Sequence, residues 1–227
     1  MAHQEDPHTY VGRAMKRRED RRLLLGAGKF VDDLRPAGCL TVAFLRSPHG
    51  HARISRLDVE SARKAPGVVA VVTGDDVRHL GPMPVNPAIP NMKIPPHPII
   101  AEGLVHTTGE PVAAVVAESA HEAWDAAALV DVEYGPLAAV SEPEAALVAG
   151  APVLYPEVDG NRSFRRTLKG GDPDAAFARA AHRVTLRVAQ ERISAVAMEP
   201  RMVVASFDPV GEELTLWVSC QSPFRIR

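Results

Sequence analysis

The stretch from residue 111 to residue 135, PVAAVVAESAHEAWDAAALVDVEYG, carries the pattern that decides the fold. It opens with Pro111–Ala117, an apolar run rich in valine that predicts a buried strand. It closes with Val130–Tyr134, which predicts a second strand. The alanine-rich residues between the two runs favour a helix. The whole stretch therefore predicts a strand–helix–strand unit.

The helix in this unit has a recognisable start. Ser119 is followed three residues later by Glu122, which is the spacing of a capping box. We expect the helix to continue to about Leu129 and to turn one apolar face toward the sheet. That face is expected to contain Ala120, Ala123, Trp124 and Ala127.

An earlier copy of the same pattern lies upstream. Residues 52–58 alternate between apolar and polar side chains, as a half-buried strand does. A short helix over residues 60–64 would end at Pro66-Gly67, and residues 68–73 form a β-branched strand. Both helices need a sheet to pack on, and we expect the two copies to share one. The predicted fold class is α+β.

A proline-rich segment separates the two copies. Residues 81–98 contain seven prolines in 18 positions, which excludes a helix or a central strand. The segment is either a binding loop or a mobile insertion, and its composition favours the mobile insertion.

A second region begins near residue 150, where residues 150–166 look irregular. Asp172 and Pro173 are typical of a helix start, and the helix should run to about Ala180. Strands are expected at 182–188, 202–207 and 213–219, with a hairpin turn at 208–212. The apolar hairpin needs a cover of further elements, so this region is expected to be incomplete. Its exposed apolar residues would be Leu214, Leu216, Trp217 and Val218.

Composition excludes several classes of protein. The 227 residues include 26 Lys and Arg against 28 Asp and Glu, so nucleic acid is not expected as the main partner. No run approaches the roughly 18 to 20 apolar residues of a membrane span, and the polar N-terminus lacks a secretory signal. We expect a cytoplasmic protein. Two cysteines, Cys39 and Cys220, exclude an iron–sulfur cluster or a four-cysteine zinc site built within this chain.

His49 and His51 are the first candidates for chemistry. On a strand, this spacing would put both imidazoles on one face, as a metal site requires. No acidic or cysteine side chain nearby supplies a third ligand. The favoured interpretation is a polar turn whose side chains bond local backbone groups, and no metal site is predicted.

Three other features have both a functional and a structural interpretation. Glu199, within Met198–Arg201, could act as a general base, but a structural bond to the backbone or an arginine is favoured. Cys220 could be a reactive thiol, but a packing role is favoured. Gly170-Gly171 could present N–H groups to an anion, although helix starts use such turns routinely. These residues alone support no catalytic assignment.

Several runs, taken in order, resemble one family: the molybdenum-binding large subunits of xanthine dehydrogenases and aldehyde oxidases. The resemblance is to the N-terminal part of these subunits and is closest to the carbon monoxide dehydrogenase large chain. The runs are Val11–Arg13, Arg17–Asp20, Leu25-Gly26, Phe30–Asp33, Arg46–Ile54, Ala65–Val68, Thr73–Asp76, Gly109–Ala113, Ala126–Leu137, Met198–Arg201 and Gln221–Phe224.

The dense charge of the first residues predicts an extended N-terminal arm, over residues 1–24. The resemblance implies an α/β-hammerhead domain over 25–138, followed by a linker over 139–160. Residues 161–227 would then begin a molybdopterin-binding domain. Gln221 matches a glutamine that hydrogen-bonds near the metal's ligands in this family, and an amide has both a donor and an acceptor for this role. Cys220 stands where threonine is common. No catalytic residue carries over.

The resemblance also implies an activity, the oxidation of an aldehyde, an N-heterocycle or carbon monoxide with water as the oxygen source. The family's glycine-rich cofactor loop and catalytic glutamate have no counterpart in this sequence, so the chain is expected to bind no cofactor and to be inactive alone. The expected partners are the rest of the large subunit, flavin and iron–sulfur subunits or domains, and a small-molecule substrate. The alternatives are a non-catalytic hammerhead module that docks onto a separately encoded remainder, or a product without function.

Overall fold

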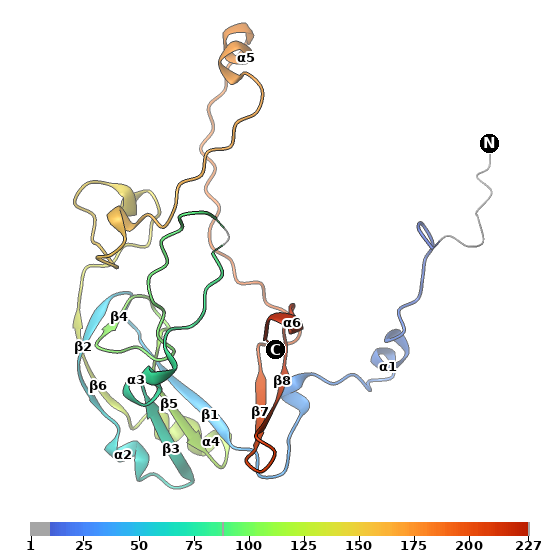
Figure 1. Ribbon diagram of the computed structural model, residues 1–227, viewed down its shortest axis with the longest axis vertical. Coiled ribbons are helices and arrows are strands. Elements are labelled where there is room, and N and C mark those ends of the chain that lie inside the picture. The colour runs from blue at the N-terminus through green and yellow to red at the C-terminus, as the bar shows by residue number, and fades with distance from the viewer. Residues whose placement is uncertain (1–9, 88, 227) are drawn as a thin grey trace. The chain divides into compact units, whose positions relative to one another are not determined.

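The computed structural model describes residues 10–87 and 89–226, so the first nine residues of the predicted arm lie outside it (Figure 1). The chain divides into two compact units. Gly38–Val184 forms one, and residues up to Ala37 together with Thr185 onward form the other. Among the described residues, no helix is long and apolar enough to span a membrane.

The Gly38–Val184 unit is built on two three-stranded sheets. In the first sheet, β5 (Pro111–Ala117) lies between β1 (Thr41–Arg46) and β3 (Val68–Thr73) and is antiparallel to both. In the second sheet, β2 (Ala52–Asp58) lies between the two-residue strand β4 (Leu104–Val105) and β6 (Asp131–Pro136). The strands predicted at 52–58, 68–73 and 111–117 are confirmed.

The two predicted strand–helix–strand copies exist, but each connects the two sheets. The first copy runs from β2 through helix α2 (Glu60–Arg63) to β3 in the other sheet, and the second runs from β5 through α4 (Ala120–Ala127) to β6. The prediction of one shared sheet is therefore wrong. Hydrophobic periodicity identifies a strand but contains no information on the strand with which it pairs.

Helix α4 begins as predicted. The Ser119 hydroxyl accepts a hydrogen bond from the Glu122 backbone N–H at 3.3 Å and donates one to the Glu122 carboxylate at 2.7 Å. The buried face consists of Ala123, Ala126 and Ala127, and small side chains there let the helix approach β1 and β5 closely. Ala120 is exposed and Trp124 is 61% exposed, so the predicted place of these two residues on the buried face is wrong.

Two buried clusters of small apolar side chains hold this unit together. The larger lies between α4 and the first sheet, and the smaller lies between the sheets. Each contains almost only alanine and valine, whose burial removes apolar surface from water without leaving polar groups unpaired. The smaller cluster contains Ala52, Ala101, Val105 and Val112.

The proline-rich segment follows α3 (Gly74–Val77) and the 3-10 helix η2 (Arg78–Leu80). Its described residues form neither helix nor strand, as predicted. The Met83 N–H donates to the His97 carbonyl at 2.7 Å and closes the base of the loop. Lys93 and Ser163 exchange two hydrogen bonds, of 2.9 Å and 2.6 Å, which tie the far end of the loop to a later segment.

Residues 139–172 are irregular except for the short 3-10 helices η3 (Ala145–Leu147) and η4 (Asp159–Asn161). The Asn161 side-chain amide nitrogen donates to the Ala146 and Pro152 carbonyls at 3.1 Å and 2.8 Å, and its oxygen accepts from the Leu154 N–H at 3.2 Å. One amide thus fixes three points of the loop. The predicted helix follows as α5 (Pro173–Arg179), capped by the Asp172 carboxylate.

The other unit contains helix α1 (Asp20–Leu24), the 3-10 helix η1 (Val31–Asp33) and the hairpin of β7 (Val203–Asp208) and β8 (Glu213–Val218). The predicted hairpin turn is confirmed, with Asp208 paired to Glu213. Residues 182–188 form no strand, so that prediction is wrong. Alternation of side chains cannot make a strand where no neighbouring strand pairs with the backbone.

Candidate functional site

Gln221, the predicted cofactor-binding residue, lies directly after the hairpin. It is exposed, and helix α6 (Pro223–Ile226) begins two residues later. Ser219 fixes the point where the hairpin ends, because its hydroxyl donates to the Pro200 carbonyl at 3.0 Å and accepts from the Met202 N–H at 3.2 Å. Gln221 is therefore an exposed residue just after a strand whose end is anchored to the segment before β7.

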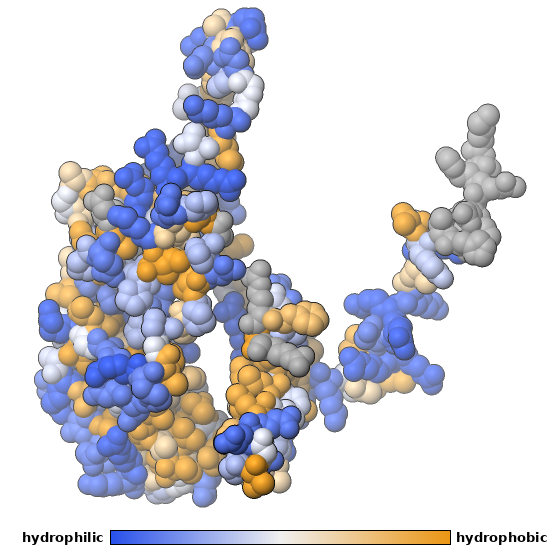
Figure 2. Space-filling view, viewed as in Figure 1, coloured by the Kyte–Doolittle hydropathy of each residue, from blue (hydrophilic) through white to orange (hydrophobic). Residues whose placement is uncertain are grey.

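The hairpin beside Gln221 has one wholly apolar face. Its pairs Val203–Val218, Ala205–Leu216 and Phe207–Leu214 alternate with the pairs of the other face, of which Val204–Trp217 is apolar and Ser206–Thr215 and Asp208–Glu213 are polar. Phe207 and Leu214 are 61% and 58% exposed, as the sequence led us to expect of an uncovered hairpin. Figure 2 shows orange side chains gathered along β7 and β8.

The structure contradicts the prediction for Cys220 and confirms the one for Glu199. Cys220 is an exposed free thiol, so the prediction that it packs is wrong for the described chain. The Glu199 carboxylate accepts a hydrogen bond from the Val31 backbone N–H at 3.1 Å. This bond confirms the structural interpretation of Glu199, in which it joins the start of η1 to the segment before β7.

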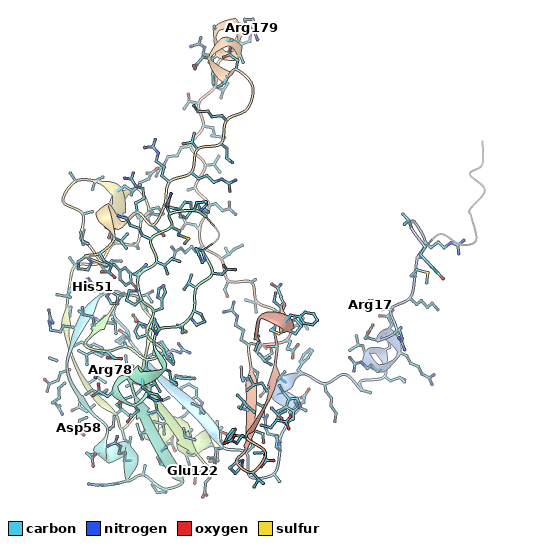
Figure 3. All side chains as sticks on the ribbon, in the orientation of Figure 1. Arg17, His51, Asp58, Arg78, Glu122 and Arg179 are labelled. Carbon is cyan, nitrogen blue, oxygen red and sulfur yellow. The ribbon has the colours of Figure 1, made fainter. Side chains whose placement is uncertain are left out.

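The two histidines of the Ser-Pro-His-Gly-His run lie in the bend before β2, not on a strand, so the argument that puts both rings on one face is wrong. Ser47 forms the polar turn that was favoured: its hydroxyl accepts from the His49 N–H at 3.0 Å. His51 is 9% exposed, and its Nδ1 lies 2.9 Å from the Ala138 carbonyl oxygen (Figure 3). Among the described residues, no three His, Cys, Asp or Glu side chains form a group that could hold a metal ion.

His51 belongs to a row of stacked rings that the sequence did not reveal. Its ring centroid lies 5.7 Å from that of His106, which stacks on Tyr155 at 4.3 Å. Burial lowers the pKa of His106, an effect that the Glu110 carboxylate opposes. Burial also raises the pKa of Tyr155, so both rings are held in their neutral forms. No sequence motif joins these positions, which the fold brings together from distant segments.

A cavity of about 410 Å³ lies beside His106 and Tyr155. Prolines of the 81–98 loop form one side, and Glu157 and the Arg78–Glu102 ion pair supply the charged groups. This volume is within the range of small-molecule sites. Gly170-Gly171, by contrast, lies in an exposed turn before α5, where Gly171 has φ +66°.

Comparison with known proteins places the chain in a family. Residues 25–138 match the family described as aldehyde oxidase and xanthine dehydrogenase, a/b hammerhead domain, and residues 154–227 match the molybdopterin cofactor-binding domain. A relative in Paenarthrobacter nicotinovorans, the 6-hydroxypseudooxynicotine dehydrogenase complex subunit gamma, is 40% identical over 92% of this chain and 27% of its own length. The carbon monoxide dehydrogenase large chain of Afipia carboxidovorans is 34% identical over 96% of this chain and 28% of its own.

A solved structure agrees with these matches. Quinoline 2-oxidoreductase from Pseudomonas putida 86 superposes with a TM-score of 0.82 and 38% identity, over 91% of this chain and 26% of that one. This chain thus spans little more than a quarter of the length of the proteins that it matches. The hammerhead fold and the start of a molybdopterin-binding domain are confirmed. The chain belongs to the aldehyde oxidase and xanthine dehydrogenase family and resembles the large subunits of its molybdenum hydroxylases.

Proposed function

We propose that this chain supplies the hammerhead domain and the first part of the molybdopterin-binding domain to the large subunit of a molybdenum hydroxylase. The observation that carries the proposal is the pair of matches at residues 25–138 and 154–227 in one chain. The proposed organisation is an arm over residues 1–24, a hammerhead domain over 25–138, a linker over 139–160 and a cofactor-binding part over 161–227.

Gln221 is proposed to hydrogen-bond the molybdenum cofactor. The residue fits this group, because an exposed neutral amide can donate through Nε2 and accept through Oε1 without adding charge. Ser219 holds the strand end that precedes Gln221 through its bonds to Pro200 and Met202. The molybdenum cofactor supplies the two-electron redox chemistry when it is bound. This chain is proposed to position the cofactor rather than to supply a catalytic side chain.

The proposed reaction is the oxidation of a small molecule with water as the oxygen source. Relatives are named for 6-hydroxypseudooxynicotine, carbon monoxide and quinoline. The proposed substrate classes for this chain are aldehydes, N-heterocycles and carbon monoxide. The electrons would leave through iron–sulfur and flavin groups on partner subunits or domains. The cysteine content supports the placement of the iron–sulfur groups outside this chain, since its two cysteines are both free and exposed.

A chimera tests the proposal. Residues 1–227 would replace the matching segment of the carbon monoxide dehydrogenase large chain, which would be produced with its natural partner subunits. We expect an assembled complex with about one molybdenum per chimera. Gln221→Ala should lower molybdenum and pterin content together, whereas the exposed Gln190→Ala should leave both unchanged. An assembled chimera without molybdenum would contradict the proposal.

A second function is favoured by the self-contained core of the Gly38–Val184 unit. Its two buried clusters are built from residues of this unit alone. The chain could therefore act as a non-catalytic module that docks onto a separately encoded remainder of the enzyme. Co-purification with a polypeptide that carries the family's glycine-rich cofactor loop would support this function, and a stable monomer without any partner would contradict it.

A further inference from the structure

The cavity of about 410 Å³ beside His106 and Tyr155 is apolar over most of its wall. The apolar side chains come from α3, from both ends of the proline-rich loop, from the residue after that loop and from β4. They are Val77, Pro82, Pro96, Pro98, Ile99 and Leu104. A wall of this kind can remove the hydrocarbon part of a small molecule from water.

The segments that form this wall are fixed by contacts of their own. The Met83 N–H donates to the His97 carbonyl and closes the base of the proline-rich loop. In the segment that contains Glu157, the Val158 N–H donates to the Tyr155 carbonyl at 2.9 Å, and the Val158 side chain is buried. A ligand does not have to order either segment, which lowers the entropic cost of binding.

Three polar groups of the lining are available to a ligand. The Glu157 carboxylate, the Tyr155 hydroxyl and the ring nitrogens of His106 make no hydrogen bond or ion pair with any residue that the structure describes. Burial lowers the pKa of His106, so its imidazole is neutral at about pH 7.5 and one ring nitrogen can accept a hydrogen bond. The carboxylate and the hydroxyl can also accept. The lining therefore offers acceptors to a ligand that carries N–H donors.

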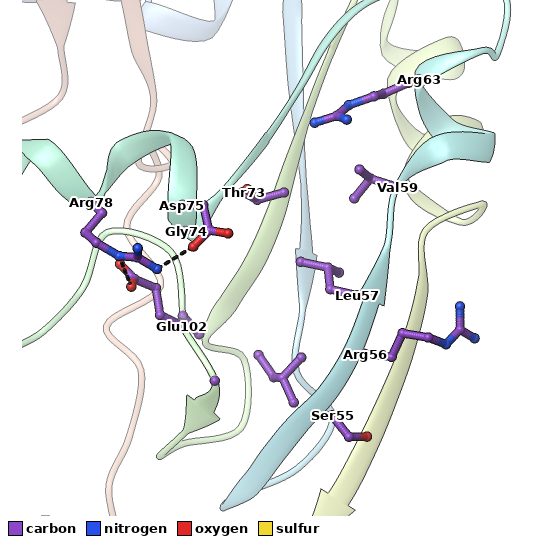
Figure 4. Close-up of a pocket in the computed structure, with 13 residues that line it drawn as sticks. Ser55, Arg56, Leu57, Val59, Arg63, Thr73, Gly74, Asp75, Arg78 and Glu102 are labelled. Atoms are coloured by element: carbon purple, nitrogen blue, oxygen red, sulfur yellow. Dashed lines mark hydrogen bonds and ion pairs between the residues drawn. The ribbon is translucent and has the colours of Figure 1, made fainter.

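The charges of the lining select the sign of that ligand. Arg78 is the one arginine or lysine among the described lining residues, and its guanidinium is already bonded to Asp75 and Glu102 (Figure 4). Within the lining, Arg78 and Glu102 cancel, and the Glu157 carboxylate leaves a net negative charge. An anionic ligand would meet no available cationic group, whereas an ammonium ion would pair with Glu157.

We propose that this cavity binds a small organic amine in its ammonium form. The apolar ring of the ligand packs on the prolines, and its ammonium group donates to the Glu157 carboxylate. The Tyr155 hydroxyl and the His106 imidazole are the further acceptors, and they fix the orientation of the ligand. The site lies within the Gly38–Val184 unit, and the proposal does not rest on the molybdenum cofactor.

The test uses the full chain and three probes of similar size that differ in charge: phenethylamine, a cation at about pH 7.5, neutral phenethyl alcohol and anionic phenylpropionate. Binding is followed through the NMR signals of the histidine rings, assigned with single histidine variants. Phenethylamine should shift the His106 signal with half-saturation below about 5 mM and leave the exposed His121 unchanged. The alcohol should bind at least about threefold more weakly, and phenylpropionate should give no saturable shift.

Variants of the lining complete the test. Glu157→Gln should weaken phenethylamine binding at least about threefold and leave binding of the alcohol unchanged, whereas the exposed Glu118→Gln just after β5 should change neither. Tyr155→Phe keeps a ring for the stack but removes one acceptor, and should weaken phenethylamine binding about threefold.

Three results would each overturn the proposal: half-saturation by phenethylamine above about 5 mM, equal affinity for the amine and the alcohol, or wild-type affinity of Glu157→Gln for the amine. Loss of amine binding would leave the molybdenum content of the chimera unchanged, so this proposal and the proposed function fail separately.

Discussion

The imidazole ring of His106 lies nearly parallel to the phenol ring of Tyr155, with ring centroids 4.3 Å apart and 13° between the ring planes. Offset ring pairs at this separation stabilise a fold beyond the area that they bury. Burial lowers the pKa of His106 and raises that of Tyr155. Burial therefore favours the uncharged form of both rings.

Acid should lower the stability of the fold at His106. Because the pKa of His106 is lowered in the folded state, the unfolded chain binds the proton more readily. The stabilisation is complete above the ordinary histidine pKa of about 6.5 and is lost as the pH falls below it. Urea unfolding of the wild type should show a larger loss of stability between about pH 7.5 and 5.5 than His106→Phe, which keeps a ring but cannot titrate. The exposed His121→Phe is the control and should behave like the wild type.

Gly74 should not tolerate a side chain. The carbonyl oxygen of Ala101 would lie 3.0 Å from the new Cβ, and backbone cannot move away as a flexible side chain can. Gly74→Ala should lower the free energy of unfolding by about 1 to 3 kcal/mol, measured by urea titration. Gly170→Ala, where no atom lies within 4 Å of the added Cβ, is the matched control. Equal effects of the two variants would show that the contact at Gly74 is unimportant.

Removal of the Ser119 hydroxyl should destabilise helix α4. Its bonds to the Glu122 N–H and carboxylate close the first turn of the helix that covers the first sheet. Ser119→Ala should lower the free energy of unfolding by about 1 kcal/mol. The exposed Ser141→Ala should have no measurable effect. If Ser119→Ala left the free energy of unfolding unchanged, packing alone would position the helix.

Asn161 should hold the loop before α5 in place. Its amide bonds three backbone groups, and its own φ is +57°. Asn161→Ala loses the bonds and keeps a strained backbone, whereas Asn161→Gly loses only the bonds. Hydrogen exchange at Leu154 should therefore quicken in both variants, and the alanine variant should be the less stable by about 1 kcal/mol. Unchanged exchange at Leu154 in both would contradict this role.

Local signals in the sequence predicted the helices and strands well. The Ser119 cap, the Asp172 cap and the valine-rich run at Pro111–Ala117 depend on residues that are close in the chain, and the structure has all three. The two-sheet arrangement could not be predicted, because pairing between β2 and β6 depends on residues that are far apart in sequence.

The residues of the candidate sites were harder to predict from the sequence than the helices and strands. Gln221 was found only through resemblance to a family, since an isolated glutamine has no distinctive spacing. His106 and Tyr155 were missed because each is defined by its neighbours in space. Trp124 was placed on the wrong face because a 3.6-residue period fits two adjacent stripes along a helix. The stripe that is buried in the structure consists of alanines, whose small side chains let α4 lie close to the sheet.

The amount of molybdenum bound per polypeptide is the most direct test of the central claim, that this chain is part of a molybdenum hydroxylase large subunit. Elemental analysis would compare the purified chain with the chimera that restores the rest of a related large subunit. We expect almost no molybdenum on the chain alone and about one atom per assembled chimera. Stoichiometric molybdenum on the chain alone, or none on an assembled chimera, would contradict it.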